Sequence, residues 1–225
     1  MMIDKKEMAQ ILRNIVISWY RHNGRYFPWR TTKDPYKVLI AEVLLRRTQA
    51  DRVIKPYQGL IEQYPTPESL SKADIKEILK WFKPLGLFNR ADSLIEACKQ
   101  IEHNYGGNIP NELDKLLDLP CIGTYGASAI LSMVFNEPVP MIDGSSGRLL
   151  RRVIGLENRG PAYSDKTLMK IAHELVPTQD PHSFNLGLLD IAYHYCKVST
   201  PLCEKCPLNQ ICYYSRKLNK KETSP

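Results

Sequence analysis

The chain has 225 residues, 43% of them hydrophobic and 24% charged, which suffices for one domain or two small ones with a real core. The formal net charge of +7 favours an anionic partner such as nucleic acid, although a solvated Lys-rich surface gives the same balance. No stretch approaches the roughly 20 apolar residues of a membrane span, and the first residues lack the apolar run of a signal peptide. We therefore expect a cytoplasmic protein without membrane contact.

Helical spacing of apolar residues recurs along the chain, starting with an amphipathic helix that contains Met8 and Trp19. A loop is expected over residues 21–30, and Asp34-Pro35 then opens a helix over residues 36–49, with Asp34 as its cap. Further helices are predicted over residues 67–71, 74–82, 90–105, 112–117, 145–154, 165–176 and 184–195. No run alternates as a strand should, so the predicted fold is all-α.

Glu42 stands inside the apolar run of the helix expected over residues 36–49. A buried carboxylate is costly unless it is paired, protonated or functional. It is either a core acid bonded to a helix end or a residue of a site. The functional reading is favoured because Arg46 and Arg47 follow four and five residues later, where the helix should emerge toward an anion.

Residues 119–143 have the form of a helix-hairpin-helix. Pro120 ends one helix, and Ile122-Gly123 forms a tight turn in which Gly tolerates a positive φ. The free N–H groups at the start of the next helix are suited to bind phosphate, although an ordinary αα-hairpin is the alternative. Asp143 follows in an apolar, proline-rich setting, as a functional acid, as the N-cap of the next helix, or as both.

Four cysteines near the C-terminus are separated by six, two and five residues: Cys196, Cys203, Cys206 and Cys212. Such thiols in a cytoplasmic chain are more often ligands than disulfides, and four of them can hold zinc or an iron–sulfur cluster. Structural zinc usually uses two short-spaced pairs, whereas only one is present, so a 4Fe-4S cluster is favoured. Lys197 and Lys205 in this loop would face solvent or a DNA phosphate.

Together these features resemble the helix-hairpin-helix DNA glycosylases of the endonuclease III superfamily, over residues 25–214. The cysteine spacing is that of the superfamily's cluster. The resemblance implies two helical subdomains with the active site in the cleft between them. One is a six-helix barrel with the hairpin, over residues 27–140. The other joins residues 1–26 to residues 141–215 and carries the cluster loop, residues 196–212, and residues 216–225 form a basic tail.

Within the superfamily, Phe27-Pro28-Trp29-Arg30 and Leu44-Leu45-Arg46-Arg47-Thr48 resemble the branch that holds the adenine glycosylases acting opposite oxidised guanine and the archaeal-type G/T mismatch thymine glycosylases. Three features favour the second group. The chain has Tyr125 where adenine enzymes usually have Ser and bifunctional members have the Schiff-base lysine. Segments 44–48 and 184–188 resemble the thymine enzymes, which places Leu186 in the base pocket. A short tail follows Cys212, whereas adenine enzymes usually carry a further domain.

Two positions depart from the pattern of these relatives. Cys121 replaces the first Gly of the usual hairpin, where its Cβ is expected to strain the turn or reshape the phosphate site. Ser145 stands where both groups of relatives have Asn, which puts in question any role of that Asn in positioning the acid.

The resemblance implies a monofunctional glycosylase of base excision repair that flips out thymine or uracil mispaired with guanine and hydrolyses its N-glycosidic bond. Asp143 would stabilise the cationic sugar and orient or deprotonate water, as in glycosidases. Glu42 would hydrogen-bond or protonate the leaving base, which requires a raised pKa. Tyr125 has no amine, so no Schiff base forms and the strand is not cut.

The expected partner is double-stranded DNA with a mismatched or damaged base, bound by a monomer associated with the nucleoid. The N–H groups of Gly123 and Tyr125 would hold a phosphate, and Arg148 is a further DNA contact. One of Arg46, Arg47 and Gln49 would enter the vacated stack or contact the orphan guanine, simple phosphate binding being the alternative for the arginines. Rival functions are an adenine glycosylase, a bifunctional lyase and a non-catalytic DNA-binding protein.

Overall fold

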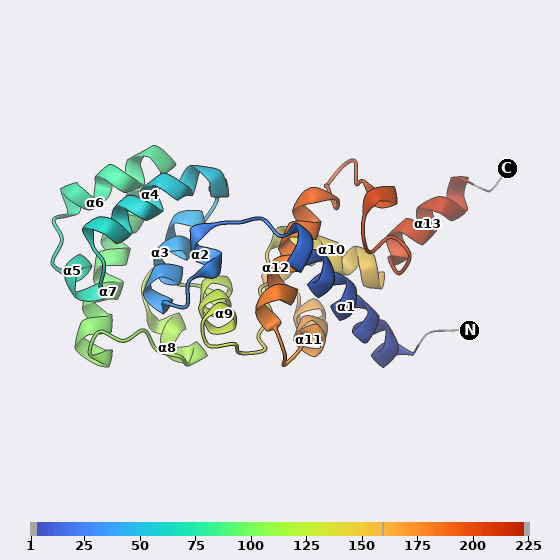
Figure 1. Cartoon of the computed structure of the whole chain (residues 1–225), viewed down its shortest axis with the longest axis horizontal. Coiled ribbons are helices and arrows are strands. Elements are labelled where there is room, and N and C mark those ends of the chain that lie inside the picture. The colour runs from blue at the N-terminus through green and yellow to red at the C-terminus, as the bar shows by residue number, and fades with distance from the viewer. Residues whose placement is uncertain (1–3, 159, 223–225) are drawn as a thin grey trace. The chain divides into compact units, whose positions relative to one another are not determined.

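The computed structural model describes residues 4–158 and 160–222, with the side chains of 219–222 left out. Its described residues form helices and no strand, which confirms the predicted all-α class. The chain divides into two compact units (Figure 1): a middle unit, Tyr26–Phe135, and a terminal unit, Met1–Arg25 with Asn136–Pro225. Within the described residues, no helix combines the length and the apolar character that crossing a lipid bilayer requires.

The middle unit is built around the apolar helix α3. Its helices are α2 (Pro28–Thr31), α3 (Pro35–Leu45), α4 (Ala50–Gln63), α5 (Pro67–Ser71), α6 (Ile75–Phe82), α7 (Ala91–Tyr105), α8 (Leu113–Asp118) and α9 (Thr124–Met133). As expected, the carboxylate of Asp34 caps α3 by accepting from the N–H of Tyr36. Residues 38–44 are all buried because α3 packs against both α4 and α9.

Three helix boundaries of the middle unit differ from the prediction. Helix α3 ends at Leu45 rather than at residue 49, because Arg46 is extended and Arg47 is left-handed, with φ of 60°. Helix α4 was missed, since it contains Pro56 and Gly59. A Cβ at Gly59 would lie 2.1 Å from the ring of Trp81, so this glycine lets α4 approach α6. Residues 28–31 are helical although a loop was expected.

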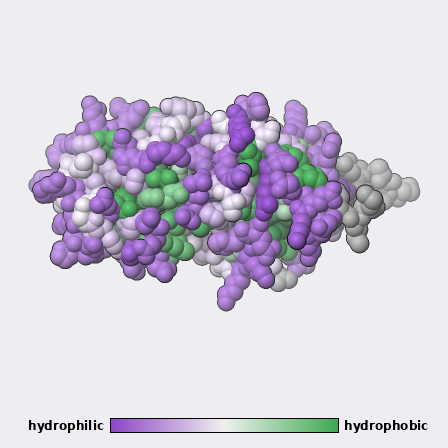
Figure 2. Space-filling model, turned by 60° about the horizontal axis from the view of Figure 1, so that its bottom comes forward, coloured by the Kyte–Doolittle hydropathy of each residue, from purple (hydrophilic) through white to green (hydrophobic). Residues whose placement is uncertain are grey.

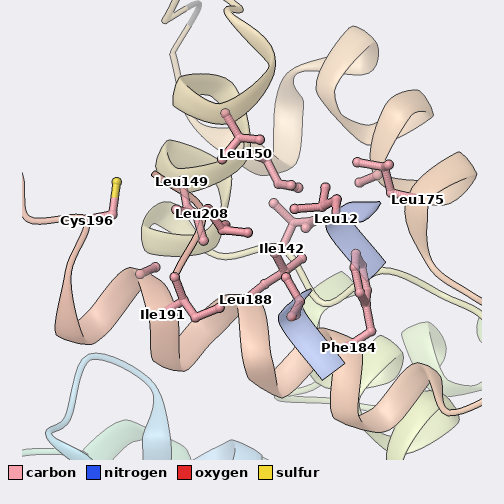
Figure 3. Packing of buried hydrophobic residues seen from close by; sticks show 14 of the residues in the cluster. Leu12, Ile142, Leu149, Leu150, Leu175, Phe184, Leu188, Ile191, Cys196 and Leu208 are labelled. Carbon is pink, nitrogen blue, oxygen red and sulfur yellow. The ribbon is translucent and has the colours of Figure 1, made fainter. Parts of the chain in front are cut away.

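The terminal unit contains α1 (Lys5–Asn23), α10 (Gly144–Ile154), α11 (Lys166–Leu175), α12 (Pro181–His194) and α13 (Tyr213–Glu222). Its core forms where α12 packs against α1 and α10, and Figure 3 shows Ile142 next to Leu12 and Leu188 in this core. Gly187 permits the contact with α1, since a Cβ there would lie 2.7 Å from Cγ1 of Val16.

Two boundaries of the terminal unit also differ from the prediction. Helix α12 starts at Pro181, three residues before the expected start, because the carboxylate of Asp180 caps it by accepting from the N–H of Ser183. Residues 216–222, expected as a basic tail, continue helix α13, and residues 223–225 lie outside the described part. On the face drawn in Figure 2, hydrophilic side chains predominate and apolar areas are small and scattered.

Candidate functional site

Asp143 is the N-cap of α10, and its two carboxylate oxygens have different surroundings. Oδ1 accepts three hydrogen bonds, from the N–H of Ser145 at 2.8 Å, the N–H of Ser146 at 2.7 Å and the hydroxyl of Ser146 at 2.9 Å. The hydroxyl of Ser146 in turn accepts from the N–H of Asp143, which completes a capping box. Among the described residues Oδ2 has no hydrogen-bond partner. The half-buried side chain is thus held through one oxygen and offers the other to a ligand.

Glu42 is buried in the middle unit, with 8% of its surface exposed. Burial raises the pKa of its carboxyl from 4.5 to about 8, and the positive charge of Arg30 opposes the shift. The raised pKa agrees with the expectation for a proton donor and makes the neutral acid the main form at neutral pH. Arg30 is itself buried, with its guanidinium 5.2 Å from the ring centre of Phe27.

The first turn of α9 lies against Glu42. A Cβ at Gly126 would lie 3.7 Å from the Cβ of Glu42 and 3.9 Å from Cγ2 of Ile122. Tyr125 precedes Gly126 in this turn and is half-buried. Within the middle unit, the fold therefore brings the predicted proton donor and the helix that carries the predicted phenol together.

The hairpin turn between α8 and α9 places its left-handed residue differently from the prediction. The positive φ, 64°, belongs to Cys121, whereas Gly123 is extended, with φ of −118°. A non-glycine residue in this region costs about 1–2 kcal/mol, so Cys121 strains the turn as its Cβ led us to expect. Gly123 is the exposed N-cap of α9 and has no side chain with which to cap the helix.

Three arginines surround one surface depression of the middle unit. Arg46, Arg47 and Arg90 line it together with Phe88 and Cys121. Burial and the nearby positive charge of Arg46 lower the pKa of Arg90. Guanidinium groups that repel one another favour an anionic ligand, which agrees with the expected role of Arg46 and Arg47 at DNA. The contribution of Arg90 and Phe88 was missed, because only the fold brings their segment beside residues 46–47.

The four predicted ligand cysteines line a single small cavity of the terminal unit: Cys196, Cys203, Cys206 and Cys212. Among the described residues, no three Cys, His, Asp or Glu side chains are arranged to hold one metal ion. Because the four thiols line a shared cavity and do not converge on one position, they suit a bound group that is larger than a single ion. Burial raises the pKa of the Cys206 thiol to about 11, so bound cations would be needed to keep it ionised at neutral pH.

Two arginines of α10 tie the cysteine loop to the helix that Asp143 caps. Nη1 of Arg152 lies 3.4 Å from Sγ of Cys196 and donates to the carbonyl of Lys197 at 2.6 Å. Nε of Arg148 donates to the carbonyl of Cys196 at 2.9 Å. Arg148 thus has a structural partner, and its contact with DNA stays a prediction.

The remaining predicted residues lie as follows. Lys197 donates to the carbonyl of Tyr193, with its ammonium 4.8 Å from the centre of that ring, and Lys205 is exposed. Gln49 is the exposed N-cap of α4. Leu186 is 3% exposed on α12, yet it is not among the residues that form the core cluster of the terminal unit. The roles of these four residues in DNA and base binding stay predictions.

Comparison with known proteins identifies the relatives of this chain. Residues 40–177 match the family described as the HhH-GPD superfamily base excision DNA repair protein. The chain is 40% identical over 215 residues to the thymine-DNA glycosylase of Aeropyrum pernix, covering 93% of this chain and 96% of that one. It is 34% identical over 206 residues to an adenine DNA glycosylase of Buchnera aphidicola, covering 90% of this chain and 58% of that one.

A solved structure shares the fold. The structure of a thermostable thymine-DNA glycosylase superposes with a TM-score of 0.89 at 35% identity, covering 94% of this chain and 98% of that one. The resemblance stated from the sequence is therefore confirmed. Asp143, Glu42 and the start of α9 thus belong to a chain whose sequence and fold are those of one repair family. The protein belongs to the HhH-GPD superfamily of base excision DNA repair proteins.

Proposed function

We propose that the protein is a monofunctional DNA glycosylase that hydrolyses the N-glycosidic bond of thymine or uracil mispaired with guanine. The observation that carries the proposal is Asp143, whose Oδ1 is fixed by three donors while Oδ2 has no partner among the described residues. Relatives that match nearly the full chain support it, since their names are thymine-DNA glycosylase and thymine/uracil-DNA glycosylase.

The reaction needs an acid and a base with opposite protonation. The flipped nucleotide loses its base as the C1′–N bond breaks, and the sugar becomes cationic. Oδ2 of Asp143 stabilises this charge and orients the water whose oxygen adds to C1′, while the water's proton leaves through the carboxylate or to solvent. The neutral carboxyl of Glu42 donates its proton to the departing base, as its raised pKa permits.

Tyr125 determines that the reaction stops at an abasic site. A phenol cannot form the Schiff base through which an amine would open the sugar, so the strand stays intact. DNA is gripped by the uncapped start of α9 at Gly123 and by Arg46, Arg47 and Arg90, which line one depression. Affinity accordingly falls with rising salt, because bound counterions are released from the phosphates.

The cysteine cavity would hold a 4Fe-4S cluster through Cys196, Cys203, Cys206 and Cys212. Such a cluster would cross-link the loop 196–212, so that Lys197 and Lys205 could meet the DNA backbone. Iron and sulfide analysis of anaerobically purified protein tests this assignment. Replacement of Cys203 by Ser should remove bound iron, whereas replacement of Cys98, which is buried in the middle unit, should not.

The substrate is tested by incubating purified protein with labelled duplexes that contain T:G, U:G or A opposite 8-oxoguanine. Base release from T:G and U:G without strand cleavage before alkali is expected, from a protein that elutes as a monomer. Release of adenine alone would assign the protein to the function of its adenine glycosylase relatives. Covalent trapping by borohydride would indicate a lyase, and binding without any release would indicate a non-catalytic protein.

A further inference from the structure

The segment that leads into Asp143 has little regular structure of its own. Residues 136–143 follow the point at which the chain leaves the middle unit and end at the N-cap of α10. Pro138 and Pro140 have no N–H to donate. Met141 and Ile142 are nonetheless 1% and 5% exposed, so the polar groups of this backbone need partners inside the protein.

Asn185 supplies two of those partners from the first half of α12. Its side chain is fully buried, and Oδ1 accepts from the N–H of Met141 at 3.1 Å. Its Nδ2 donates to the carbonyl of Val139 at 2.9 Å. A single side-chain amide therefore makes the donor and acceptor contacts that a neighbouring strand would make.

We infer that Asn185 is a positioning residue for base excision, because its amide clamps residues 139–141 to α12 and thereby sets where the carboxylate of Asp143 stands. The inference rests on the proposed function, in which Asp143 acts on the nucleotide. Only Ile142 separates the clamped Met141 from Asp143, and the capping box holds Asp143 from the other side. The carboxylate thus lies between two anchors, of which the upstream one is Asn185.

Losing the clamp affects the acid more than the fold. Replacement by Leu keeps the branched shape and the number of heavy atoms of the side chain, although its volume is larger, and it leaves a buried N–H and a buried carbonyl without partners. The segment relieves this cost by shifting, and Asp143 shifts with it. A displacement of about 1 Å in a catalytic group lowers a rate on the order of 100-fold. Leu186, which is expected in the base pocket, follows Asn185 directly in α12. One helical turn therefore carries both the clamp and the predicted pocket residue.

The test compares Asn185→Leu with Ile191→Ala, a control that opens a cavity on the same helix six residues beyond the clamp. Single-turnover base release from U:G is measured at a temperature at which circular dichroism shows both variants folded. We expect Asn185→Leu to lose about 10- to 100-fold in rate while its affinity for the duplex stays within about twofold of wild type. Ile191→Ala should keep its rate despite a comparable loss of melting temperature. An unchanged rate in Asn185→Leu, or an equal loss in the control, overturns the inference.

A second variant covers the possibility that Asn185→Leu does not fold. Asp at position 185 accepts from Met141 in either form, but it donates to the carbonyl of Val139 only when it is protonated. The rate of Asn185→Asp relative to wild type should therefore rise as pH falls. A ratio that stays constant with pH contradicts the clamp.

Hydrogen exchange keeps the inference separate from the proposed function. Amide protection of Met141, Ser145 and Ser146 is expected to fall in Asn185→Leu and to stay unchanged in Ile191→Ala. If the wild type releases no base from any duplex, the proposed function fails, and unchanged protection in Asn185→Leu would show that the clamp fails as well. If the wild type is active, the rates decide on the positioning role alone.

Discussion

The N-termini of α9 and α10 differ in how the N–H groups of the first helical turn, which have no acceptor inside the helix, are treated. Helix α10 is closed by Asp143, whose Oδ1 takes three donors, whereas α9 begins at Gly123 and has no side-chain cap. In α10 the cap fixes the carboxylate of Asp143 through Oδ1 and leaves Oδ2 available to a ligand. An open terminus leaves N–H groups and the positive end of the helix dipole for an external anion. In the function proposed above, the capped start of α10 carries the chemistry and the start of α9 binds DNA.

The sharpest test of this contrast separates the two roles of Asp143. Asn is as good an N-cap as Asp, so Asp143→Asn should change the melting temperature little. Base release should nevertheless fall by about 10³-fold or more, since the amide cannot stabilise a cationic sugar or accept a proton. Single-turnover kinetics and thermal melting measure the two effects. Asp74→Asn, at the cap of α6, is the matched control and should keep full activity. A comparable rate loss in that control would remove the argument.

The second prediction concerns pH and Glu42. Its folded pKa of about 8 lies above the ordinary 4.5, so the folded state binds more protons than the unfolded state between these values. Stability should therefore fall as pH rises through this window, by at most about 1.4 kcal/mol for each unit of pH. Base release should fall as pH rises through about 8, because the proton donor ionises.

Glu42→Gln isolates this effect. The variant should lose about 10²-fold or more in rate and should also lose the part of the pH dependence of stability that Glu42 contributes. Urea unfolding at several pH values, together with a pH–rate profile, measures both. Glu102→Gln on α7 is the control and should retain the wild-type profile. A wild-type rate that is flat to pH 9 would contradict the role given to Glu42.

The third prediction concerns a variant that gives α9 a side-chain cap. Gly123 has an extended backbone, and a Cβ there meets nothing within 4 Å, so a side chain fits. Gly123→Asp should keep the fold, because Asp caps α9, but its charge should repel the phosphate and weaken DNA binding about tenfold. The salt dependence of the affinity, measured by fluorescence anisotropy, should become shallower by about one phosphate. Gly123→Asn, which caps without charge, should weaken binding less.

The smallest expected effect is at Cys121. Its φ of 64° costs a non-glycine residue about 1–2 kcal/mol, and Gly removes that cost at the expense of a more flexible unfolded chain. Cys121→Gly should therefore stabilise the protein by up to about 1 kcal/mol in urea unfolding, less what the half-buried thiol contributes through packing. Cys121→Ala keeps the Cβ and should give no gain. Equal stabilities of the Gly and Ala variants would show that the turn is not strained.

Local patterns predicted most of the fold, and non-local contacts account for what was missed. The all-α class followed from helical spacing, the resemblance from the quoted motifs and the cap at Asp143 from the preference of Asp for N-caps, and all three are confirmed. Helix α4 was overlooked because its Gly59 reads as a breaker until Trp81 is seen against it. The left-handed residue was placed at Gly123 by residue preference, whereas the path of the chain requires it at Cys121.

The site was predicted residue by residue but not as an arrangement. Glu42 stood out because a charge in an apolar run is costly, and its burial agrees with that reasoning. Arg90 and the Asn185 clamp carried no signal, since an arginine at the start of a helix and an asparagine within one are ordinary until their partners are known. The roles assigned to these residues at DNA are predictions for the experiments above.

The double duty of Asp143 shapes what an inactivating change at this position would do. If capping a helix and hydrolysing the glycosidic bond depend on one side chain, the mildest replacement, Asn, yields a stable protein that still holds mismatched DNA and never releases it as product. We expect such a protein to shield lesions from its active counterpart when both are present. Replacement of Asp143 by Asn would then act dominantly, because the inactive protein competes for the same DNA. Truncation of the chain would not, because it abolishes DNA binding together with the activity.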